Sequence, residues 1–230
     1  MRLSVALILP ALDEEQTIGP TLDSLAGNNL AQLIVVDNGS CDHTAEVARS
    51  RGAQVIHEPR RGYGWACLAG MAVLDPQIET VVFMDADGSD DPDDLPKILS
   101  PIERGEADLV IGSRTIGERE AGSLPPHQQF GNWLAASLLR LFYGARYTDL
   151  GPFRAIRRDA LKTLAMTDKN FGWTVEMQIK ARRRGLRVLE VPVRHRRRRA
   201  GKSKVSGTAK GSILAGAKIL WTILRYRIAE

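Results

Sequence analysis

Short apolar runs alternate with segments of helical spacing along the first 115 residues. Residues 3–9 are apolar apart from Ser4 and end at Pro10, a pattern typical of a strand that is buried on both faces. Further strands are expected over 33–36, 54–56, 81–84 and 109–111, and helices over 13–26, 42–51, from the turn at 60–64 to 73, and after Pro92. This order predicts an α/β fold, a doubly wound and mostly parallel sheet with helices on both faces.

The pattern changes after residue 115. Glycines and prolines are concentrated between 115 and 128, which predicts a loop. Helices are then expected over 130–143, 158–164 and 171–184, a turn with a short strand over 148–156, and a strand over 186–191. We expect one domain over residues 1–205, with halves 1–115 and 116–205, followed by a C-terminal amphipathic helix within 206–230.

Charge is distributed unevenly, although the net charge of +5 is modest. Residues 75–108 hold eleven acidic and two basic residues, a balance of −9. Residues 182–204 hold nine arginines, two lysines and one glutamate, a balance of +10. A cation therefore suits the first region, and an anionic partner suits the second. The run 194–199 consists of five arginines and one histidine, and we expect it not to pack and to be disordered without its ligand.

The two cysteines, Cys41 and Cys67, provide neither a disulfide framework nor a metal spacing, which suits a reducing cytoplasm. The apolar start of the chain is followed by acidic residues, so no signal peptide is expected. The most apolar late segment, 213–224, is interrupted by Gly216 and Lys218 and is shorter than the ~20 residues that a bilayer requires. A cytoplasmic protein is expected, one that touches a membrane surface at most.

An acidic run follows the strand expected over 81–84. It begins with Asp85-Ala86-Asp87, and because burying so many carboxylates would cost too much, it must lie at the exposed carboxyl end of that strand. Ligands bind at this edge in open parallel sheets. Alternation places Asp85 and Asp87 on one side of the backbone, as an oxygen pair suited to Mg²⁺ or Mn²⁺ held together with substrate phosphates. The alternative is a solvated turn that caps the next helix.

Three strand ends are expected to converge at this edge, at residues 10–14, 37–40 and 85–87. Asp37 and Asp85 could then accept hydrogen bonds from a base or a ribose, and Asp87 would ligate the metal. No G-x-G-x-x-G or G-K-[ST] run follows the first strand, which argues against a Rossmann dehydrogenase. A diphosphate must therefore be held mainly by a cation and by side chains.

An ordered set of motifs covers nearly the whole chain. The strands are followed in turn by P-A-L-D-E-E, V-V-D-N-G-S-C-D-H-T, G-Y-G-W-A, the acidic F-M-D-A-D-G-S-D-D-P and I-G-S-R, and then come D-L-G-P-F-R-A-I-R-R, W-T-V-E-M-Q-I-K-A and E-V-P-V. Together they resemble the family 2 glycosyltransferases of the GT-A fold, within the dolichol-phosphate mannosyltransferase-like and polyprenyl-phosphate glycosyltransferase-like group. The resemblance implies a nucleotide-diphosphate sugar donor (a UDP- or GDP-sugar), a divalent metal, and transfer with inversion at the anomeric carbon.

The resemblance also implies roles for single residues. In the D-x-D motif, Asp87 is the implied metal ligand, joined by Ser89, where many relatives carry Gln or Asn. The residues implied as donor contacts are Pro10, Asp13, Glu14, Asp37, Gly62, Tyr63, Asp85 and Ala86. Residues 1–115 would form the nucleotide-sugar half of the catalytic domain, and residues 116–205 the acceptor half.

On the acceptor side, the resemblance implies a phosphate contact at Arg114 and an acidic position near the acceptor at Asp149, and we expect Arg114, Asp149 and Glu176 to be the catalytic residues. Asp149 would act as a base toward a hydroxyl acceptor, or would orient a lipid phosphate that is already ionised, with a turn cap as the alternative. Glu176 is either a buried carboxylate facing the site or the partner of Arg154 or Arg158. The expected phosphate and acceptor contacts are Arg114, Arg154 and, in the basic loop 194–204, Lys202, Ser203 and Lys204.

We therefore expect a metal-dependent inverting hexosyltransferase that uses a polyprenyl or dolichyl phosphate or a related lipid, in the cytoplasm or peripherally at the cytoplasmic membrane face. A soluble hydroxyl acceptor is the nearest alternative. A nucleotidyltransferase would be expected to show a glycine-rich loop after the first strand. A nucleic-acid-binding protein would rest on the arginine run alone, without interleaved aromatic residues, so no nucleic acid partner is expected.

Overall fold

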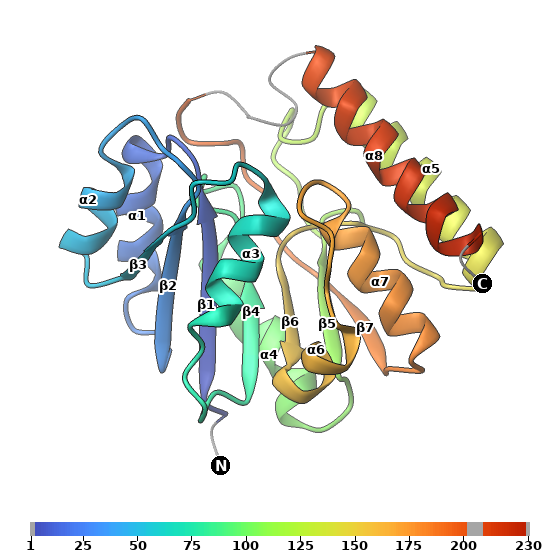
Figure 1. The fold of residues 1–230 in the computed structure, drawn as a ribbon, viewed down its shortest axis with the longest axis horizontal. Helices are drawn as coiled ribbons and strands as arrows, with labels where there is room; N and C mark the ends of the chain where they lie inside the picture. The colour runs from blue at the N-terminus through green and yellow to red at the C-terminus, as the bar shows by residue number, and fades with distance from the viewer. Residues whose placement is uncertain (1–2, 202–208, 229–230) are drawn as a thin grey trace.

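One seven-stranded sheet organises the computed structural model of the protein, which describes residues 3–201 and 209–228 (Figure 1). The strand order is β3-β2-β1-β4-β6-β5-β7. The strands are β1 (Val5–Ala11), β2 (Gln32–Asp37), β3 (Gln54–His57), β4 (Thr80–Phe83), β5 (Leu109–Ser113), β6 (Arg154–Arg157) and β7 (Val188–Pro192).

The sheet is parallel except at β6, which runs antiparallel to both β4 and β5. The predicted, mostly parallel sheet is confirmed. In the register, Arg154 at the start of β6 pairs with Phe83 at the end of β4 and with Ile111 near the end of β5. The residues that lead into β6 therefore lie at the same edge as the carboxyl ends of the parallel strands.

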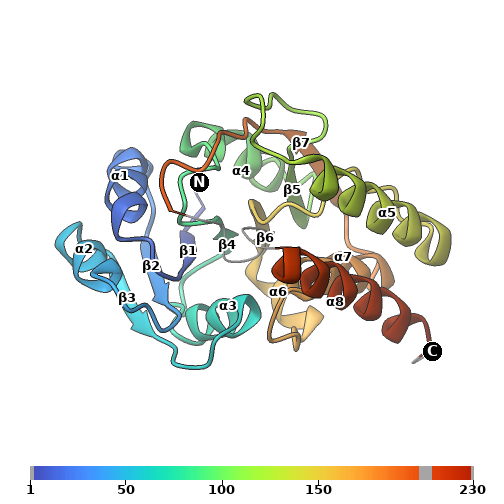
Figure 2. The same cartoon turned by 90° about the horizontal axis from the view of Figure 1, so that it is seen from above.

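Helices cover both faces of the sheet, as predicted (Figure 2). One face packs against α1 (Glu15–Leu25), α2 (Thr44–Ser50) and α4 (Leu95–Glu103), and the other packs against α3 (Tyr63–Ala72), α6 (Arg158–Leu164) and α7 (Trp173–Arg183). A short 3-10 helix, η1 (Pro92–Asp94), precedes α4. Both faces of the central strands are apolar, which is why those strands read as continuous hydrophobic runs.

Two further helices, α5 (Pro126–Tyr143) and α8 (Ala209–Ile228), lie side by side beyond the β7 end of the sheet (Figures 1 and 2). With α7 they share a third apolar cluster that contains Leu139, Ile179 and Ile223. Among the described residues, no helix has both the length and the apolar character needed to cross a membrane. Residues 206–208, at the start of the range predicted for the last helix, lie outside the described residues.

Most element boundaries differ from the predictions by one or two residues, and two of the differences have a clear physical reason. Strand β1 continues through Pro10 to Ala11, because β4 ends opposite Ile8 and no strand there requires the N–H that proline lacks. Helix α5 begins at Pro126, four residues earlier than predicted. Proline is favoured in the first turn of a helix, where its missing N–H would have no helical partner. The predicted loop therefore ends at residue 125.

The start of α3 packs tightly against residues 168–169. Trp65 N donates a hydrogen bond to Lys169 O at 3.2 Å. A Cβ on Gly62 would lie 2.3 Å from Lys169 O, and a Cβ on Gly64 would lie 2.1 Å from Asp168 O. Gly62 also has a φ of +148°. The glycines of the G-Y-G-W motif are therefore required for this contact between the two halves of the chain.

We predict that Gly64→Ala lowers the free energy of unfolding by about 1–3 kcal/mol, because the backbone at Asp168 has to move away from the new methyl group. The matched control is Gly131→Ala in α5, where an added Cβ meets nothing within 4 Å. That change should be neutral or should stabilise the protein by up to about 1 kcal/mol. Urea unfolding followed by circular dichroism measures both. Equal effects would contradict the tight packing at Gly64.

Candidate functional site

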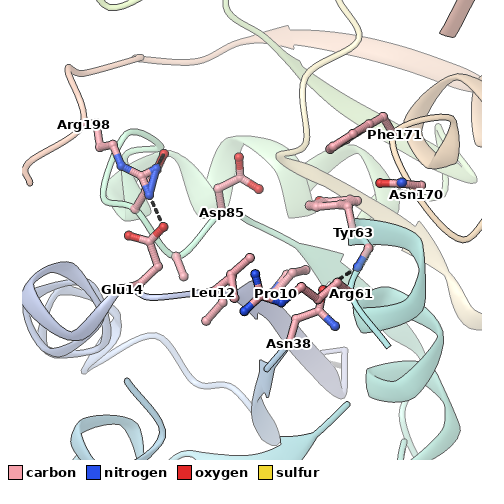
Figure 3. A pocket seen from close by; sticks show the side chains of 14 residues that line it. Pro10, Leu12, Glu14, Asn38, Arg61, Tyr63, Asp85, Asn170, Phe171 and Arg198 are labelled. Atoms are coloured by element: carbon pink, nitrogen blue, oxygen red, sulfur yellow. Dashed lines mark hydrogen bonds and ion pairs between the residues drawn. The ribbon is translucent and has the colours of Figure 1, made fainter. Parts of the chain in front are cut away.

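A cavity of about 290 Å³ lies at the carboxyl edge of the sheet (Figure 3). It is lined by residues that follow β1, β2 and β4, by the start of α3, by residues before α7, and by Arg198. The lining residues are Pro10, Ala11, Leu12, Glu14, Asn38, Arg61, Gly62, Tyr63, Asp85, Ala86, Asp87, Asn170, Phe171 and Arg198. The predicted convergence of strand ends is therefore present in the structure.

Asp37 and Asp13, both expected at the donor site, do not line this cavity. Asp37 accepts a hydrogen bond from Ser40 N at 2.9 Å, and its second oxygen lies 3.1 Å from His57 Nδ1. Asp13 accepts one from Cys41 N at 2.8 Å. Both carboxylates brace the loop that follows β2, so they shape the edge of the cavity from behind.

Asn38 lines the cavity in place of Asp37 and was not among the predicted residues. Its amide donates hydrogen bonds to the carbonyls of Glu58 and Arg60, and its side-chain oxygen accepts one from Gly62 N at 2.8 Å. Only an amide side chain can donate and accept in this way. The sequence could have indicated this residue, because Asn38 in the D-N-G-S turn directly follows the strand and therefore lies at the carboxyl edge of the sheet.

The acidic loop after β4 gathers several carboxylates. Burial, together with the negative charges of Asp87 and Asp90, raises the pKa of Asp85 well above its usual range. Asp90 Oδ2 accepts a hydrogen bond from Asp85 N, while Asp90 Oδ1 is buried without a hydrogen-bond partner. Asp87 Oδ1 accepts one from Ser89 N at 2.9 Å. Ser89 is buried and does not line the cavity.

This donor set fits a metal that is shared with a substrate. Within the described residues, no three His, Cys, Asp or Glu side chains are gathered closely enough to form a metal site by themselves. Mg²⁺ is usually held by one or two carboxylates together with substrate phosphates and water. Asp87 on the cavity wall, beside the strongly perturbed Asp85, supplies that kind of incomplete site.

The basic strap, residues 194–199, crosses this acidic loop. Arg194 and Arg196 both pair with Asp91, at 3.0 and 2.6 Å. The prediction that this run does not pack and is disordered is therefore wrong: the acidic region around Asp91 neutralises it and fixes its path. Lys202, Ser203 and Lys204, the other predicted phosphate contacts, lie outside the described residues.

Arg114 and Asp149 form a buried, two-pronged ion pair. Arg114 Nε and Nη2 donate to the two carboxylate oxygens at 2.8 and 2.7 Å, and the N–H groups of Arg114 and Leu150 donate at 2.7 Å each. Burial alone would raise the pKa of Asp149, but Arg114 and these N–H groups lower it overall. A carboxylate whose oxygens already accept four hydrogen bonds is poorly suited to accept a proton. Of the two predicted roles of Asp149, this favours orienting the acceptor over acting as a base.

Arg154 does not line the cavity either. It is fully buried and donates hydrogen bonds to the carbonyls of Leu150, Gly151 and Thr174. Burial lowers the pKa of Arg154 to about 10. The guanidinium thus holds the turn that follows Asp149 against α7.

Glu176 pairs with Lys180 at 2.7 Å, and not with Arg154 or Arg158 as one alternative proposed. It also accepts hydrogen bonds from the backbone N–H groups of Thr167 and Asp168 and from the Tyr226 hydroxyl, the last at 2.6 Å. Burial raises the pKa of Glu176, but Lys180 and these donors lower it overall. Glu176 does not line the cavity and instead ties residues 167–168 to α8.

Comparison with known proteins places these features in a family. Residues 6–165 match the sequence profile described as "Glycosyl transferase family 2". The chain is 35% identical to a dolichyl-phosphate hexose transferase of Haloferax volcanii, over 97% of this chain and 96% of the relative. It is 32% identical to an undecaprenyl-phosphate mannosyltransferase of Micrococcus luteus, over 98% and 99%.

The fold is also similar to that of a solved enzyme, glucosyl-3-phosphoglycerate synthase from Mycobacterium tuberculosis, crystallised with Mn²⁺ and UDP-glucose. The TM-score is 0.77 at 26% sequence identity, and the match covers 97% of this chain and 78% of the other. The predicted GT-A architecture is therefore confirmed.

We predict a pH-dependent effect of Asp149→Asn on stability. At pH 7 the substitution should lower the free energy of unfolding by about 3–5 kcal/mol, because it leaves the Arg114 charge buried and unpaired. Since the pKa of Asp149 is lowered in the folded protein, this contribution is present above about pH 4 and is lost as the pH falls through the folded-state value. The difference between the two proteins should therefore narrow below about pH 4.

Urea unfolding between pH 7 and pH 3 tests this. The control is Asp159→Asn, since Asp159 is 95% exposed and should change stability by no more than about 0.5 kcal/mol. A difference for Asp149→Asn that stays constant down to pH 3 would argue against an ionised pair.

Proposed function

Since the chain belongs to glycosyl transferase family 2, we propose that it transfers a sugar from a UDP- or GDP-sugar to a lipid phosphate, with inversion at the anomeric carbon. The donor half of the proposal rests on the cavity at the carboxyl edge of the sheet, which Asp85 lines and where Asp87 lies 3.2 Å from the guanidinium of Arg198. Such an arrangement suits a ligand that carries a diphosphate and a cation together. The similarity to an enzyme crystallised with Mn²⁺ and UDP-glucose supports the same assignment.

Asp87 would hold the divalent ion, Mg²⁺ or Mn²⁺, with Ser89 as a second candidate ligand. When bound, the ion would act as a Lewis acid that stabilises negative charge on the departing diphosphate. Arg61 and Arg198, both on the cavity wall, would neutralise further phosphate charge. Pro10, Leu12 and Asn38 would line the nucleoside part of the cavity.

The proposed lipid phosphate acceptor rests on the fact that the carboxylate of Asp149 is fully hydrogen-bonded. Among the described residues, the hydrogen bonds of its carboxylate are with Arg114 and with backbone N–H groups, so it is not available as a base. A hydroxyl acceptor would need one, whereas a phosphate monoester is already ionised near pH 7. The names of the two relatives, which act on undecaprenyl phosphate and dolichyl phosphate, support the same class of acceptor. Arg114 would orient that phosphate.

A lipid acceptor requires that the protein contact a membrane surface, and the exposed face of α8 is suited to that contact. Its exposed apolar residues follow helical spacing, with Leu214, Trp221, Leu224 and Ile228 at intervals of seven, three and four. Arg225 and Arg227 lie in the last turn. A helix with an apolar stripe and arginines lies in the plane of an anionic bilayer interface. We place the protein peripherally at such a surface.

The test of the function is sugar transfer in vitro. We predict that the protein with Mn²⁺ forms a lipid-extractable product from a radiolabelled UDP- or GDP-sugar and undecaprenyl phosphate, and that EDTA abolishes the reaction. Asp87→Ala should reduce the rate by at least about 100-fold, because the metal would lose its principal ligand. Unphosphorylated polyprenol, which lacks the anion, should not react.

The control is Asp93→Asn, which removes a carboxylate of the same acidic loop that is 74% exposed and should keep near-normal activity. Transfer to a soluble hydroxyl compound in place of undecaprenyl phosphate would refute the lipid acceptor, and activity in EDTA would refute the metal.

We also predict that Trp221→Ser weakens binding to vesicles of phosphatidylcholine and phosphatidylglycerol by about fivefold or more, because Trp221 is 57% exposed on the apolar stripe. Co-sedimentation measures the bound fraction. Leu189→Ser on β7, also partly exposed at 40%, should leave vesicle binding unchanged. Equal binding of all three proteins would rule out α8 as the contact surface.

A further inference from the structure

Arg198 lies inside the cavity and bridges two of its carboxylates (Figure 3). Its Nη1 lies 3.2 Å from Asp87 Oδ2, and its Nη2 is bonded to Glu14 Oε1. The side chain is only 17% exposed. A guanidinium therefore occupies one oxygen of the carboxylate that we assign to the metal, and it joins the end of β1 to the acidic loop.

The backbone around Arg198 is fixed independently of this contact. Arg196 N donates to Ser89 O at 2.8 Å, and Arg197 N donates to a carboxylate oxygen of Glu120 at 2.8 Å. The neighbouring Arg199 N lies 3.4 Å from Asp87 O. Because the strap is held by these bonds, the Arg198 side chain can turn away from Asp87 while the strap stays in place.

The position of the Arg198 guanidinium is also favourable electrostatically. Glu14, Asp85 and Asp87 all line the cavity, and Arg198 pairs with Glu14 and with Asp87. Three carboxylates on one cavity wall repel one another, and a positive charge between them relieves that repulsion. Arg198 supplies a positive charge at this position.

We propose that Arg198 is a stand-in cation, which holds Asp87 and Glu14 together until a divalent ion is bound and which must release Asp87 for that carboxylate to become a metal ligand. Once released, its guanidinium can pair with the diphosphate of the donor. This inference rests on the proposed function, since it takes Asp87 as the metal ligand. Arg198 then opposes binding of the ion alone and favours binding of the ion with a nucleotide diphosphate, which couples the two binding events.

Mn²⁺ affinity, measured by electron paramagnetic resonance of the free ion with and without UDP, tests the exchange. Arg198→Ala should bind Mn²⁺ alone about fivefold more tightly than the wild type, and should bind UDP in the presence of Mn²⁺ about fivefold more weakly. Effects of opposite sign are the signature of the exchange, because a residue that only supports the fold would weaken both. R198K keeps the positive charge but lacks the planar guanidinium that can reach two carboxylates at once. Its affinities for Mn²⁺ and for UDP should lie between those of the wild type and Arg198→Ala.

Arg197→Ala is the matched control, since Arg197 belongs to the same strap, is 61% exposed and lies near Glu120; its Mn²⁺ affinity should equal that of the wild type. If Arg198→Ala and R198K both bind Mn²⁺ alone no more tightly than the wild type, the stand-in role is wrong. If the wild type binds no Mn²⁺ even with UDP, the proposed function fails together with it. The two failures are therefore distinguishable.

Discussion

The structure depends on the compensation of negative charge at one edge of the sheet. Parallel strands bring Glu14, Asp85 and Asp87 together at the cavity, and the acidic loop adds Asp90 and Asp91 behind them. Such a cluster is stable only if cations lie close to it. Arg194, Arg196 and Arg198 of the basic strap provide them, which explains why a run of arginines follows a fixed path across the loop.

The antiparallel strand β6 makes the second half of the chain part of the same site. Because it runs opposite to β4 and β5, the turn before it lies at the carboxyl edge, and Asp149 reaches Arg114 just after β5. A parallel strand in that place would have put the turn at the far end of the sheet. The direction of one short strand thus decides whether the two halves share a cleft.

The sequence was sufficient to predict features that depend on residues close together in the chain. Apolar runs located the first and fourth strands to within two residues of their ends, and the acidic residues after the fourth strand were expected at the exposed edge, where Asp85 and Asp87 line the cavity. It was insufficient where the partner of a residue is distant in the chain. Asp37 was predicted to contact the donor because spacing does not show that Ser40 and His57 occupy its carboxylate.

The path of the basic strap and the direction of β6 could not be predicted from the sequence for the same reason. Read in isolation, a run of like charges is solvated and disordered, and the carboxylates that order it lie about a hundred residues earlier, at Asp91 and Asp94. A four-residue strand carries no mark of its direction, which is set by the strands on either side. Helix α8 shows the same dependence: Lys218 pairs with Asp168 at 2.9 Å and Tyr226 with Glu176. Those contacts hold the segment that leads to Asn170 and Phe171 on the cavity wall, so the surface that we assign to the membrane and the wall of the donor cavity are two sides of one packed unit.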